Sequence, residues 1–263
     1  MSIFKKKQEK IVGKKEYLIT ENVPFGVQEA FRNLKASLAV SIPKKATKEG
    51  QAVLITSPCP EAGKTTVAVN LALMFAQSKA KVLLIDADVR KGRVARYFHC
   101  KSAPGLADLL SGQATLEDVL HDFDKAKNFH YITCGTHSPR PYELFESDAM
   151  KSLLSELKKQ YDYIVIDTPP VLLLSDALAL IPETDGTVVV CRHMVSHVGD
   201  IAKTLDTLSF AKANVLGVVV NDYRPREKTT KYTYGKYDYY AYGGYEYTAS
   251  ESEAEEEVAQ TNA

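Results

Sequence analysis

One short segment constrains the fold of this chain more than any other. It reads TSPCPEAGKTT and begins at Thr56, at the end of an apolar run that starts at Ala52. The apolar pattern that resumes at Lys64 predicts a helix over residues 64–77. A loop that ends in Gly-Lys-Thr between a buried strand and a helix is typical of phosphate-binding P-loops, whose backbone N–H groups surround a phosphate. A chance Gly-Lys-Thr after a strand is the alternative, and other strand ends help to decide between the two.

The residue types in this loop suit a bound nucleotide. Lys64 would reach the β- and γ-phosphates and serve catalysis, and the hydroxyl of Thr65 would ligate Mg²⁺. One departure is Pro58, which replaces the first glycine of the GxxxxGK[ST] pattern. Proline has no N–H and a fixed φ, so that end of the loop needs a different shape. The predicted nucleotide-binding residues of the loop are Ser57, Glu61, Ala62, Gly63, Lys64, Thr65 and Thr66.

Two further apolar strands end in aspartate. The run VLLIDAD carries Asp86 and Asp88, and the run YIVIDTPP carries Asp167. Because ligands of open α/β sheets bind beyond the carboxyl ends of the strands, we expect the three strand ends to converge on one crevice. Carboxylates and hydroxyls are hard oxygen ligands of the kind that Mg²⁺ prefers. A single aspartate could cap a helix instead, but the three ends together predict a site for ATP and Mg²⁺, with Thr65, Asp88 and Asp167 at the metal.

Helix and strand patterns alternate along the chain, which predicts an α/β fold: a mostly parallel β-sheet flanked by helices on both faces, of the P-loop NTPase kind. In the first helix, Val27, Phe31, Leu34 and Leu38 are spaced as a stripe that faces the core. The predicted strands cover residues 52–56, 81–86, 129–134, 161–167, 187–191 and 215–221, and the predicted helices cover 27–40, 64–77, 106–110, 116–120, 148–159 and 198–211.

The charge pattern divides the chain into a domain and two tails. A basic N-terminal tail covers residues 1–20, the P-loop domain covers 21–225, and a Tyr-rich, acidic C-terminal tail covers 226–263. Such tails are typically solvated and disordered, although the first lysines could also be attracted weakly to an anionic membrane. Lys and Arg total 33, as do Asp and Glu, so the net charge gives no pull toward nucleic acid.

The sequence lacks the patterns of secreted and membrane-spanning chains. No apolar run approaches the roughly 18–20 residues that cross a bilayer, and the first lysines are not followed by the apolar segment of a signal peptide. The four cysteines are far apart and form no CxxC pair, which is unlike a disulfide framework or a zinc site and predicts small buried residues in a reducing cytosol. We therefore expect a cytoplasmic protein.

The C-terminal tail is unusually rich in tyrosine. Half of residues 232–247 are tyrosines, and five glutamates follow between residues 251 and 257. Tyrosines spaced by Lys, Asp, Gly and Thr cannot bury a core, so we expect this segment to stay mobile. It is either a set of phosphate acceptors or a low-complexity segment without that role. The candidate phosphoacceptors are Tyr232, Tyr234, Tyr237, Tyr239, Tyr240, Tyr242, Tyr245 and Tyr247.

Taken together, these motifs resemble those of the bacterial tyrosine kinases of capsule and exopolysaccharide export. The resemblance covers residues 20–225 and the character of the tail. The family's P-loop, its motif ending in DxDxR and its motif ending in DxxP correspond here to Ser57–Thr65, Ile85–Arg90 and Ile166–Pro169. The family's loop usually reads PGEGK[ST], whereas this chain has PEAGKT, which puts the shape of the loop in doubt but not its lysine and hydroxyl.

The resemblance implies roles for residues of the site. Asp86 would accept the proton of the attacking tyrosine hydroxyl, and Asp88, also assigned to catalysis, would hold Mg²⁺ with Asp167. Arg90 would support the site or a subunit contact. Asn221, at the end of the last strand, would contact adenine, with Arg224 nearby.

The resemblance also implies partners. The family's ExxRxxR motif, used in ring-like self-association, corresponds to Glu29, Arg32 and Lys35, although lysine lacks the bidentate fork of arginine. A ring-like homo-oligomer, an octamer by resemblance, is therefore expected. The other expected partners are a membrane-spanning activator or polysaccharide co-polymerase, which would bring the chain to the inner face of the cell membrane, and a cognate tyrosine phosphatase; no nucleic acid is expected.

A second family shares the three motifs. They also resemble those of the partitioning and division-site ATPases, which hydrolyse ATP to switch between monomer and dimer. Those ATPases typically have an extra lysine near the start of the loop, where this chain has Ser57 and Pro58. That difference and the tyrosine cluster favour an ATP-dependent protein-tyrosine kinase that phosphorylates its own tail. An assembly-switch ATPase and a non-catalytic ATP-binding scaffold remain the alternatives.

Overall fold

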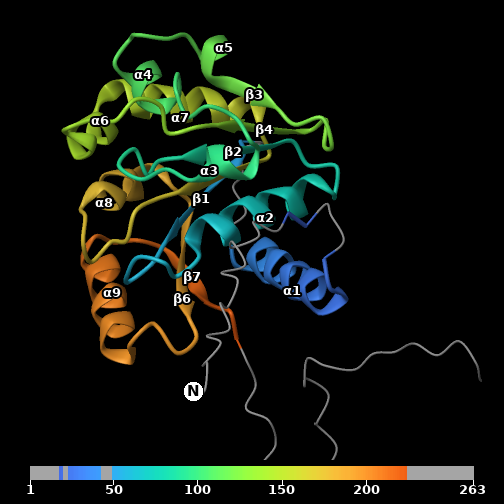
Figure 1. Cartoon of the computed structure of the whole chain (residues 1–263). Helices are drawn as coiled ribbons and strands as arrows, with labels where there is room; N and C mark the ends of the chain where they lie inside the picture. Colours follow the sequence, from blue (N-terminus) through green and yellow to red (C-terminus); the bar gives the residue numbers. More distant parts are fainter. Residues whose placement is uncertain (1–17, 20–22, 43–48, 224–263) are drawn as a thin grey trace, which may run out of the picture. The chain divides into compact units, whose positions relative to one another are not determined.

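Seven strands form one β-sheet in the order β3-β4-β2-β5-β1-β6-β7 (Figure 1). The computed structural model describes residues 18–19, 23–42 and 49–223. Within them every strand pair is parallel except β3–β4, which is antiparallel. The strands are β1 Gln51–Thr56, β2 Val82–Asp86, β3 Leu120–Asp122, β4 Phe129–Ile132, β5 Tyr163–Asp167, β6 Gly186–Arg192 and β7 Val215–Asn221.

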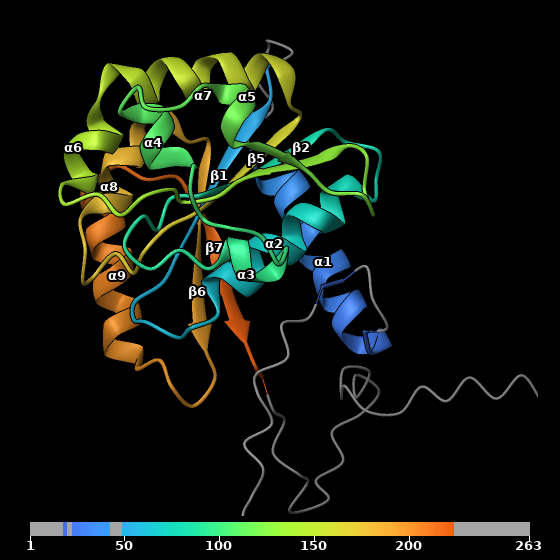
Figure 2. The same cartoon turned by 45° about the horizontal axis from the view of Figure 1, so that its top comes forward.

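Helices cover both faces of this sheet (Figure 2). One face carries α1, α2 and α3, and the other carries α4 to α9, with each group packed around its own apolar cluster. The predicted α/β fold with a mostly parallel, doubly covered sheet is therefore confirmed. The helices are α1 Phe25–Ser41, α2 Lys64–Ala76, α3 Val94–Tyr97, α4 Leu106–Leu110, α5 Leu116–Val119, α6 Pro141–Glu146, α7 Asp148–Gln160, α8 Asp176–Leu180, the 3-10 helix η1 Ile181–Glu183 and α9 Val198–Phe210.

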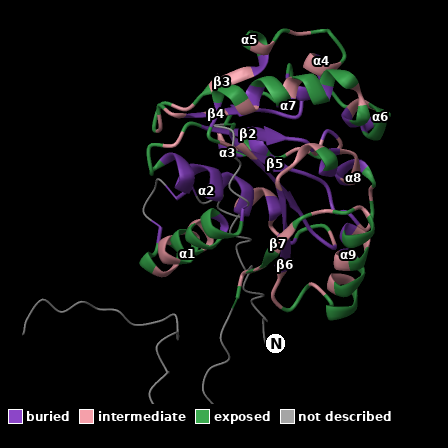
Figure 3. Ribbon diagram, turned by 180° about the vertical axis from the view of Figure 1, so that it is seen from behind, coloured by how far each residue is buried: buried purple, intermediate pink, exposed green. Residues whose placement is uncertain are grey.

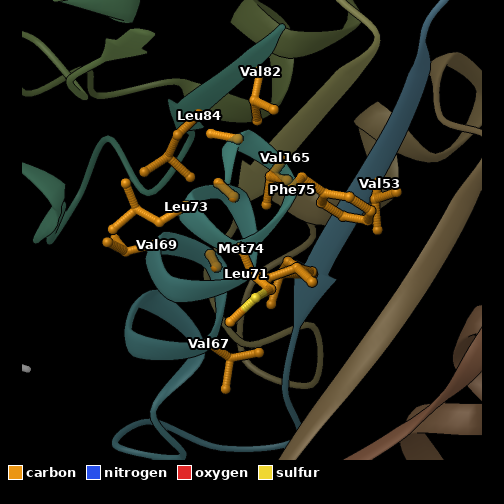
Figure 4. Close-up of a cluster of buried hydrophobic side chains, with 14 of the residues drawn as sticks. Val53, Val67, Val69, Leu71, Leu73, Met74, Phe75, Val82, Leu84 and Val165 are labelled. Atoms are coloured by element: carbon orange, nitrogen blue, oxygen red, sulfur yellow. The ribbon is translucent and has the colours of Figure 1, made fainter. Parts of the chain in front are cut away.

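The central strands are buried on both sides, which explains their continuous apolar runs. In β1, Val53 and Ile55 pack toward α2, whereas Ala52 and Leu54 pack toward the opposite helices. Successive side chains of a strand point to opposite faces, so an apolar residue at every position is needed to fill both layers. Figure 4 shows the α2 side of this core, where Phe75 of the helix lies beside Val53 and Val165 of the sheet.

Helix α2 lies at the centre of the first layer. It is buried along nearly its whole length, in contrast to α1, α7 and α9, whose outer sides are exposed (Figure 3). It is covered by the sheet on one side and by α1 on the other. A helix enclosed in this way has no polar face, as its sequence KTTVAVNLALMFA shows. The P-loop lysine thus begins a rigid, fully packed element.

The predicted core stripe of α1 is partly wrong. Leu38 is buried and Phe31 and Leu34 are partly buried, but Val27 is 42% exposed. The spacing of the four residues is helical, yet it cannot tell how far along the helix the covering layer extends. The described part of α1 therefore joins the core only from its second turn onward.

The cysteine prediction also needs correction. Cys134 and Cys191 are buried as expected, but Cys59 and Cys100 are only half-buried. All four are free thiols. Among the described helices, none has both the length and the hydrophobicity required to cross a membrane.

Candidate active site

The three strands that carry the sequence motifs are neighbours at the centre of the sheet, in the order β2-β5-β1. They run parallel, so their carboxyl ends lie at the same edge. Asp86 of β2 and Asp167 of β5 are direct partners in the strand register. The sheet alone therefore brings the P-loop and the aspartate motifs together, as the sequence predicted.

The P-loop makes its turn at Gly63, the residue before α2. Gly63 has a φ of 89°, in the left-handed region, and a Cβ built there would lie 2.0 Å from the side-chain nitrogen of Asn221. Glycine is the residue that tolerates both the backbone angle and the close approach. The turn leads directly to Lys64, so the N–H groups of the first helical turn face the mouth of the loop, where they attract an anion.

Residues at the ends of β6 and β7 form hydrogen bonds with the backbone of the P-loop. The side-chain amide of Asn221 donates to the carbonyl of Ala62 at 3.0 Å, and Arg192 Nη1 donates to the carbonyl of Glu61 at 3.3 Å. Arg192 is itself fixed by Asp222, whose Oδ2 accepts from Nε at 3.2 Å and from Nη2 at 2.9 Å. Asn221 thus contacts the loop backbone, and its expected contact with adenine stays a prediction.

Two residues of the predicted nucleotide set lie behind the loop. Ser57 is fully buried and its hydroxyl donates to the carbonyl of Cys59 at 2.7 Å. Ala62 is also fully buried. Neither lines the cleft described below, whereas Glu61, Gly63, Lys64, Thr65 and Thr66 all do. In this structure Ser57 and Ala62 shape the loop, and their direct contact with a nucleotide stays a prediction.

Asp86 lies beneath the floor of the site. It is completely buried, its Oδ1 accepts from the backbone N–H of Asp88 at 3.2 Å, and its Oδ2 accepts from the N–H of Val94 at 3.0 Å. Burial is the main cause that raises the pKa of Asp86 well above its usual value, and the nearby charge of Asp167 adds to it. The carboxyl is therefore a stronger proton acceptor than an exposed aspartate.

Asp167 is buried beside the P-loop residues. Burial raises its pKa to about 6, although the charge of Lys64 and a hydrogen bond from the Thr65 side chain act in the opposite direction. Its Oδ1 is buried and has no hydrogen-bond partner in the described part of the chain. An orphaned carboxylate oxygen next to a hydroxyl supplies hard oxygen ligands that suit a divalent cation with its water shell, and the nearby ammonium of Lys64 suits the phosphates that accompany such a cation.

Of the three motif aspartates, Asp88 is the one that lines the cleft. Its Oδ1 accepts from the backbone N–H of Lys91 at 2.9 Å, which leaves the other oxygen available to a ligand. Within the described residues, no three His, Cys, Asp or Glu side chains form a metal cluster of their own. Mg²⁺ commonly binds one or two carboxylates together with substrate phosphates, so Thr65, Asp88 and Asp167 fit a metal that arrives with a nucleotide.

These residues surround a cleft of about 370 Å³. The P-loop forms one side of it, the segment after β2 forms a second, and the segment after β5 forms a third. Sequence reasoning missed several lining residues, namely Lys91, Arg93, Tyr97, Leu173 and Leu174. The basic run RKGR, directly after the aspartates, was a usable signal, since cations beside a phosphate site are expected. Tyr97 carried no such signal, because its hydroxyl reaches Thr66 at 2.6 Å only through the tertiary fold.

An ion pair links the second and third sides of the cleft. Arg90 Nε donates to Asp176 Oδ2 at 2.7 Å and Arg90 Nη2 donates to Oδ1 at 3.2 Å. The Asp176 side chain is 2% exposed and that of Arg90 is 33% exposed. This bidentate pair fixes Arg90 at the cleft wall, which agrees with the supporting role that the motif implied.

The residues of the predicted subunit contact lie on α1. Arg32 is exposed and pairs with Glu29 of the same helix, whereas the Lys35 ammonium donates to the hydroxyl of Ser78. Lys35 is thus already engaged within the chain. Arg224 and the eight candidate phosphoacceptor tyrosines lie outside the described residues, so their roles stay predictions.

Comparisons with known proteins agree with this geometry. The family model described as an AAA domain matches residues 61–216. The tyrosine-protein kinase YwqD of Bacillus subtilis is 34% identical over 210 residues, which covers 80% of this chain and 85% of YwqD. Tyrosine-protein kinase Etk of Escherichia coli is 33% identical over 82% of the chain. The chain spans about a third of the length of several relatives, 30% of Etk and 32% of EpsB of Ralstonia nicotianae.

Solved structures give the same result. The kinase domain of the Escherichia coli tyrosine kinase ETK has a TM-score of 0.71 and 34% identity, and the match covers 79% of this chain and 80% of that domain. The MinD septum site-determining protein of Pyrococcus horikoshii, complexed with Mg-ADP, has a TM-score of 0.55 and 25% identity over 66% of this chain and 71% of MinD. The fold is therefore that of nucleotide-binding P-loop proteins, and within them the chain belongs to the family of bacterial tyrosine-protein kinases.

Proposed function

We propose that this chain is a protein-tyrosine kinase that transfers the γ-phosphoryl group of ATP to tyrosines of its own C-terminal tail. The observation that carries the proposal is the arrangement around Asp167, whose unpartnered buried oxygen lies beside Lys64 and Thr65. This arrangement suits a nucleotide phosphate with its metal. Membership in the tyrosine-kinase family supports a phenol as the acceptor.

Phosphate binding falls to the P-loop. The N–H groups at the start of α2 and the ammonium of Lys64 hold the β- and γ-phosphates, and Lys64 is only 8% exposed, which strengthens its attraction for an anion. Thr65, Asp88 and Asp167 would hold Mg²⁺, directly or through water, and the metal would supply positive charge against the phosphates. Phosphoryl transfer depends mainly on the position of the reactants and on stabilisation of the phosphate charge, so the protein needs to supply little covalent chemistry.

The acceptor must lose a proton during the transfer. The phenol oxygen bonds to the γ-phosphorus, the bond from that phosphorus to the ADP oxygen breaks, and the phenol proton passes to a carboxylate. We assign this carboxylate to Asp86, because its raised pKa suits a proton acceptor. Both its oxygens are occupied by backbone N–H groups, so the segment from Ala87 to Val94 must shift when the acceptor binds.

The acceptors and partners extend the proposal beyond the described residues. The tyrosines between residues 232 and 247 are the acceptors, and the reaction regulates capsular or exopolysaccharide synthesis and export. Glu29, Arg32 and Lys35 mediate a ring-like homo-oligomer. A membrane-spanning activator holds the chain at the cytoplasmic face of the membrane, and a tyrosine phosphatase reverses the modification. Capsule-region names among the relatives and the tyrosine-kinase domains among the structural neighbours support this setting.

A nucleotide-dependent assembly switch is the second candidate. The likeness to MinD favours it, because that protein shares the fold over two thirds of this chain. A switch ATPase would release phosphate to water and leave its tyrosines unmodified. The acceptor of the phosphoryl group therefore separates the two functions.

Mapping of modified residues tests the proposal. The purified chain is incubated with ATP and Mg²⁺, and its tryptic peptides are examined by mass spectrometry. We expect phosphotyrosine within residues 232–247 in the wild type, none in Lys64→Met and strongly reduced amounts in Asp86→Ala. Lys101→Met is the matched control, since Lys101 is exposed and does not line the cleft. ATP consumption without phosphotyrosine in the wild type would refute the kinase and favour the switch.

A further inference from the structure

One side of the cleft is apolar. The segment after β5 contributes Pro169, Pro170, Leu173 and Leu174 to the lining. Leu173 is 61% exposed, so its aliphatic side chain is accessible to a ligand. This apolar wall offers an aromatic ring a surface to pack on. Neither phosphate binding nor metal binding requires such a wall.

A second side of the cleft is basic. Lys91 and Arg93 follow the aspartate motif, line the cleft and are exposed. Within the described residues no salt bridge joins either side chain to a carboxylate, although the charge of Arg93 is felt by Asp167. Arg90, in contrast, is held by Asp176. Lys91 and Arg93 therefore form a basic rim that keeps its charge available to a ligand.

The charges that line the cleft do not balance. Four of them are cationic, on Lys64, Arg90, Lys91 and Arg93, and two are anionic, on Glu61 and Asp88. Lys64 and Asp88 are assigned above to the phosphates and the metal, and Arg90 is engaged by Asp176. The rim thus carries a surplus of positive charge that the residues assigned to the phosphates and the metal do not account for.

From these two walls we infer that the outer cleft is a subsite for tyrosines with acidic neighbours: the phenol ring packs on the apolar wall, and an adjacent carboxylate or phosphate lies against the basic rim. This inference rests on the proposed function and adds the class of acceptor. It commits to an acidic peptide, because the rim attracts carboxylates and repels lysines.

The tail sequence then predicts an order of modification. Asp238 separates Tyr237 from Tyr239, and Glu246 separates Tyr245 from Tyr247. Tyr239, Tyr245 and Tyr247 have an acidic neighbour and no adjacent lysine, so they react first. Tyr237 also has Lys236 beside it and reacts later. Tyr232 follows Lys231 and has no acidic neighbour, so it reacts late. Each phosphate adds about −1.5 to −2 charges, so every modified tyrosine makes its neighbours better acceptors.

Two synthetic peptides test the inference. They have equal length and one tyrosine, flanked on both sides by glutamate in one peptide and by lysine in the other. The full-length chain is assayed on each with MgATP, and the ratio of the two kcat/KM values is recorded. We expect the glutamate peptide to be favoured by about two- to 25-fold, since each of the two exposed charge pairs contributes a factor of about 1.4 to 5. The ratio falls toward one as salt screens the rim.

Charge reversal on the rim gives the decisive variants. Lys91→Glu and Arg93→Glu should each lower the ratio by at least about twofold. Arg96→Glu is the matched control, because Arg96 is exposed on the neighbouring helix α3 but does not line the cleft. The ratio cancels any general loss of catalytic rate. A lower affinity for ATP with an unchanged ratio would show that the rim serves the nucleotide, which would overturn the inference.

A second variant tests the apolar wall. Leu173→Ser should raise the KM for the glutamate peptide and leave the KM for ATP unchanged. Val198→Ser is its control, because Val198 is 82% exposed at the start of α9, outside the cleft lining. Equal kcat/KM values for both peptides in the wild type would sink the inference while the kinase function stands. Absence of phosphotyrosine on both peptides and on the tail would instead refute the proposed function itself.

Discussion

At the scale of single residues, the site is built around two buried carboxyl groups that cost the fold stability. Asp86 and Asp167 face each other across β2 and β5, and both have raised pKa values because they are buried and close to other acids. Such groups are more easily tolerated protonated than charged. An apolar pair would pack at these two strand ends at lower cost, so the presence of two carboxyl groups supports the role in the site that we propose for them.

This reasoning predicts a pH-dependent stability for Asp167. Its folded-state pKa is about 6, above the roughly 3.9 of an unfolded chain. Between these values the folded state binds more protons than the unfolded state, so its contribution to stability is lost as the pH rises through that window. Without Mg²⁺ at pH 7.5, Asp167→Asn should therefore raise the free energy of unfolding by about 1–3 kcal/mol. The difference should narrow toward pH 4.5.

Urea denaturation in the presence of a chelator measures this effect. The affinity for MgATP should fall in Asp167→Asn, because the variant removes a proposed metal ligand. An Asp167→Asn chain that is less stable than the wild type at pH 7.5 would show that the charged carboxylate supports the fold, contrary to this account.

Gly63 offers a test of the loop geometry. Gly63→Ala places a methyl group against Asn221 and keeps a positive φ, so it should weaken ATP binding by more than about tenfold and cost about 1–2 kcal/mol of stability.

Gly112→Ala is the matched control. Gly112 also has a positive φ, of 74°, but nothing lies within 4 Å of its added Cβ. Gly112→Ala should lose only the stability that the positive φ costs. Its affinity for ATP, measured by calorimetry, should equal that of the wild type. Equal ATP affinities in both variants would contradict the assigned loop geometry.

At the scale of elements, the sequence predicted the long segments and the short helices α4 and α5, but it missed strand β3 and the short helices α3, α6 and α8. Strands β1, β2, β5 and β6 and helices α2, α7 and α9 were identified because buried parallel strands are continuously apolar and long helices repeat their pattern several times. Strand β3 has three residues, LHD, with no periodicity to detect. The short helices α3, α6 and α8 span a turn or slightly more and form mainly because their neighbours pack on them.

Some residues of the site could also be predicted from the sequence, and others could not. Glu61, Lys64, Thr65, Asp88 and the paired Asp86 and Asp167 could be found because motif and strand end coincide. The partnership of Arg90 with Asp176 could not, since 86 residues separate them and α8 itself was not predicted. The burial of Asp86 was equally hidden, because it depends on the path of the chain back over it at Val94.

The Arg90–Asp176 pair predicts an asymmetry between its two truncations. Arg90→Ala leaves a carboxylate that is 2% exposed without its cation, and should cost about 3–5 kcal/mol. Asp176→Ala leaves an arginine that is 33% exposed and can turn to water, so it should cost less. Urea denaturation of both variants, with Lys91→Ala as a near-neutral control, measures the difference. Equal costs would mean that burial does not govern this pair.

At the scale of the whole molecule, we propose that one copy presents its tail to the cleft of another. The exposed ion pair of Glu29 and Arg32 on α1 is the proposed contact. Arg32→Glu places two like charges three residues apart on this surface. It should abolish the oligomer that we expect the wild type to show in analytical ultracentrifugation, and it should leave the melting temperature nearly unchanged. Arg140→Glu is the control, because Arg140 pairs with Glu143 in the same spacing elsewhere. Dissociation by the control but not by Arg32→Glu would place the interface on another surface.

The central claim is that a phosphoryl group passes from bound ATP to a phenol. The most direct measurement follows ATP labelled on its γ-phosphate and records how the label divides between protein and free phosphate. The account predicts base-stable label on tyrosine in the wild type and none in Lys64→Met. Label that appears in the wild type only as free phosphate, while ATP is consumed, would contradict it.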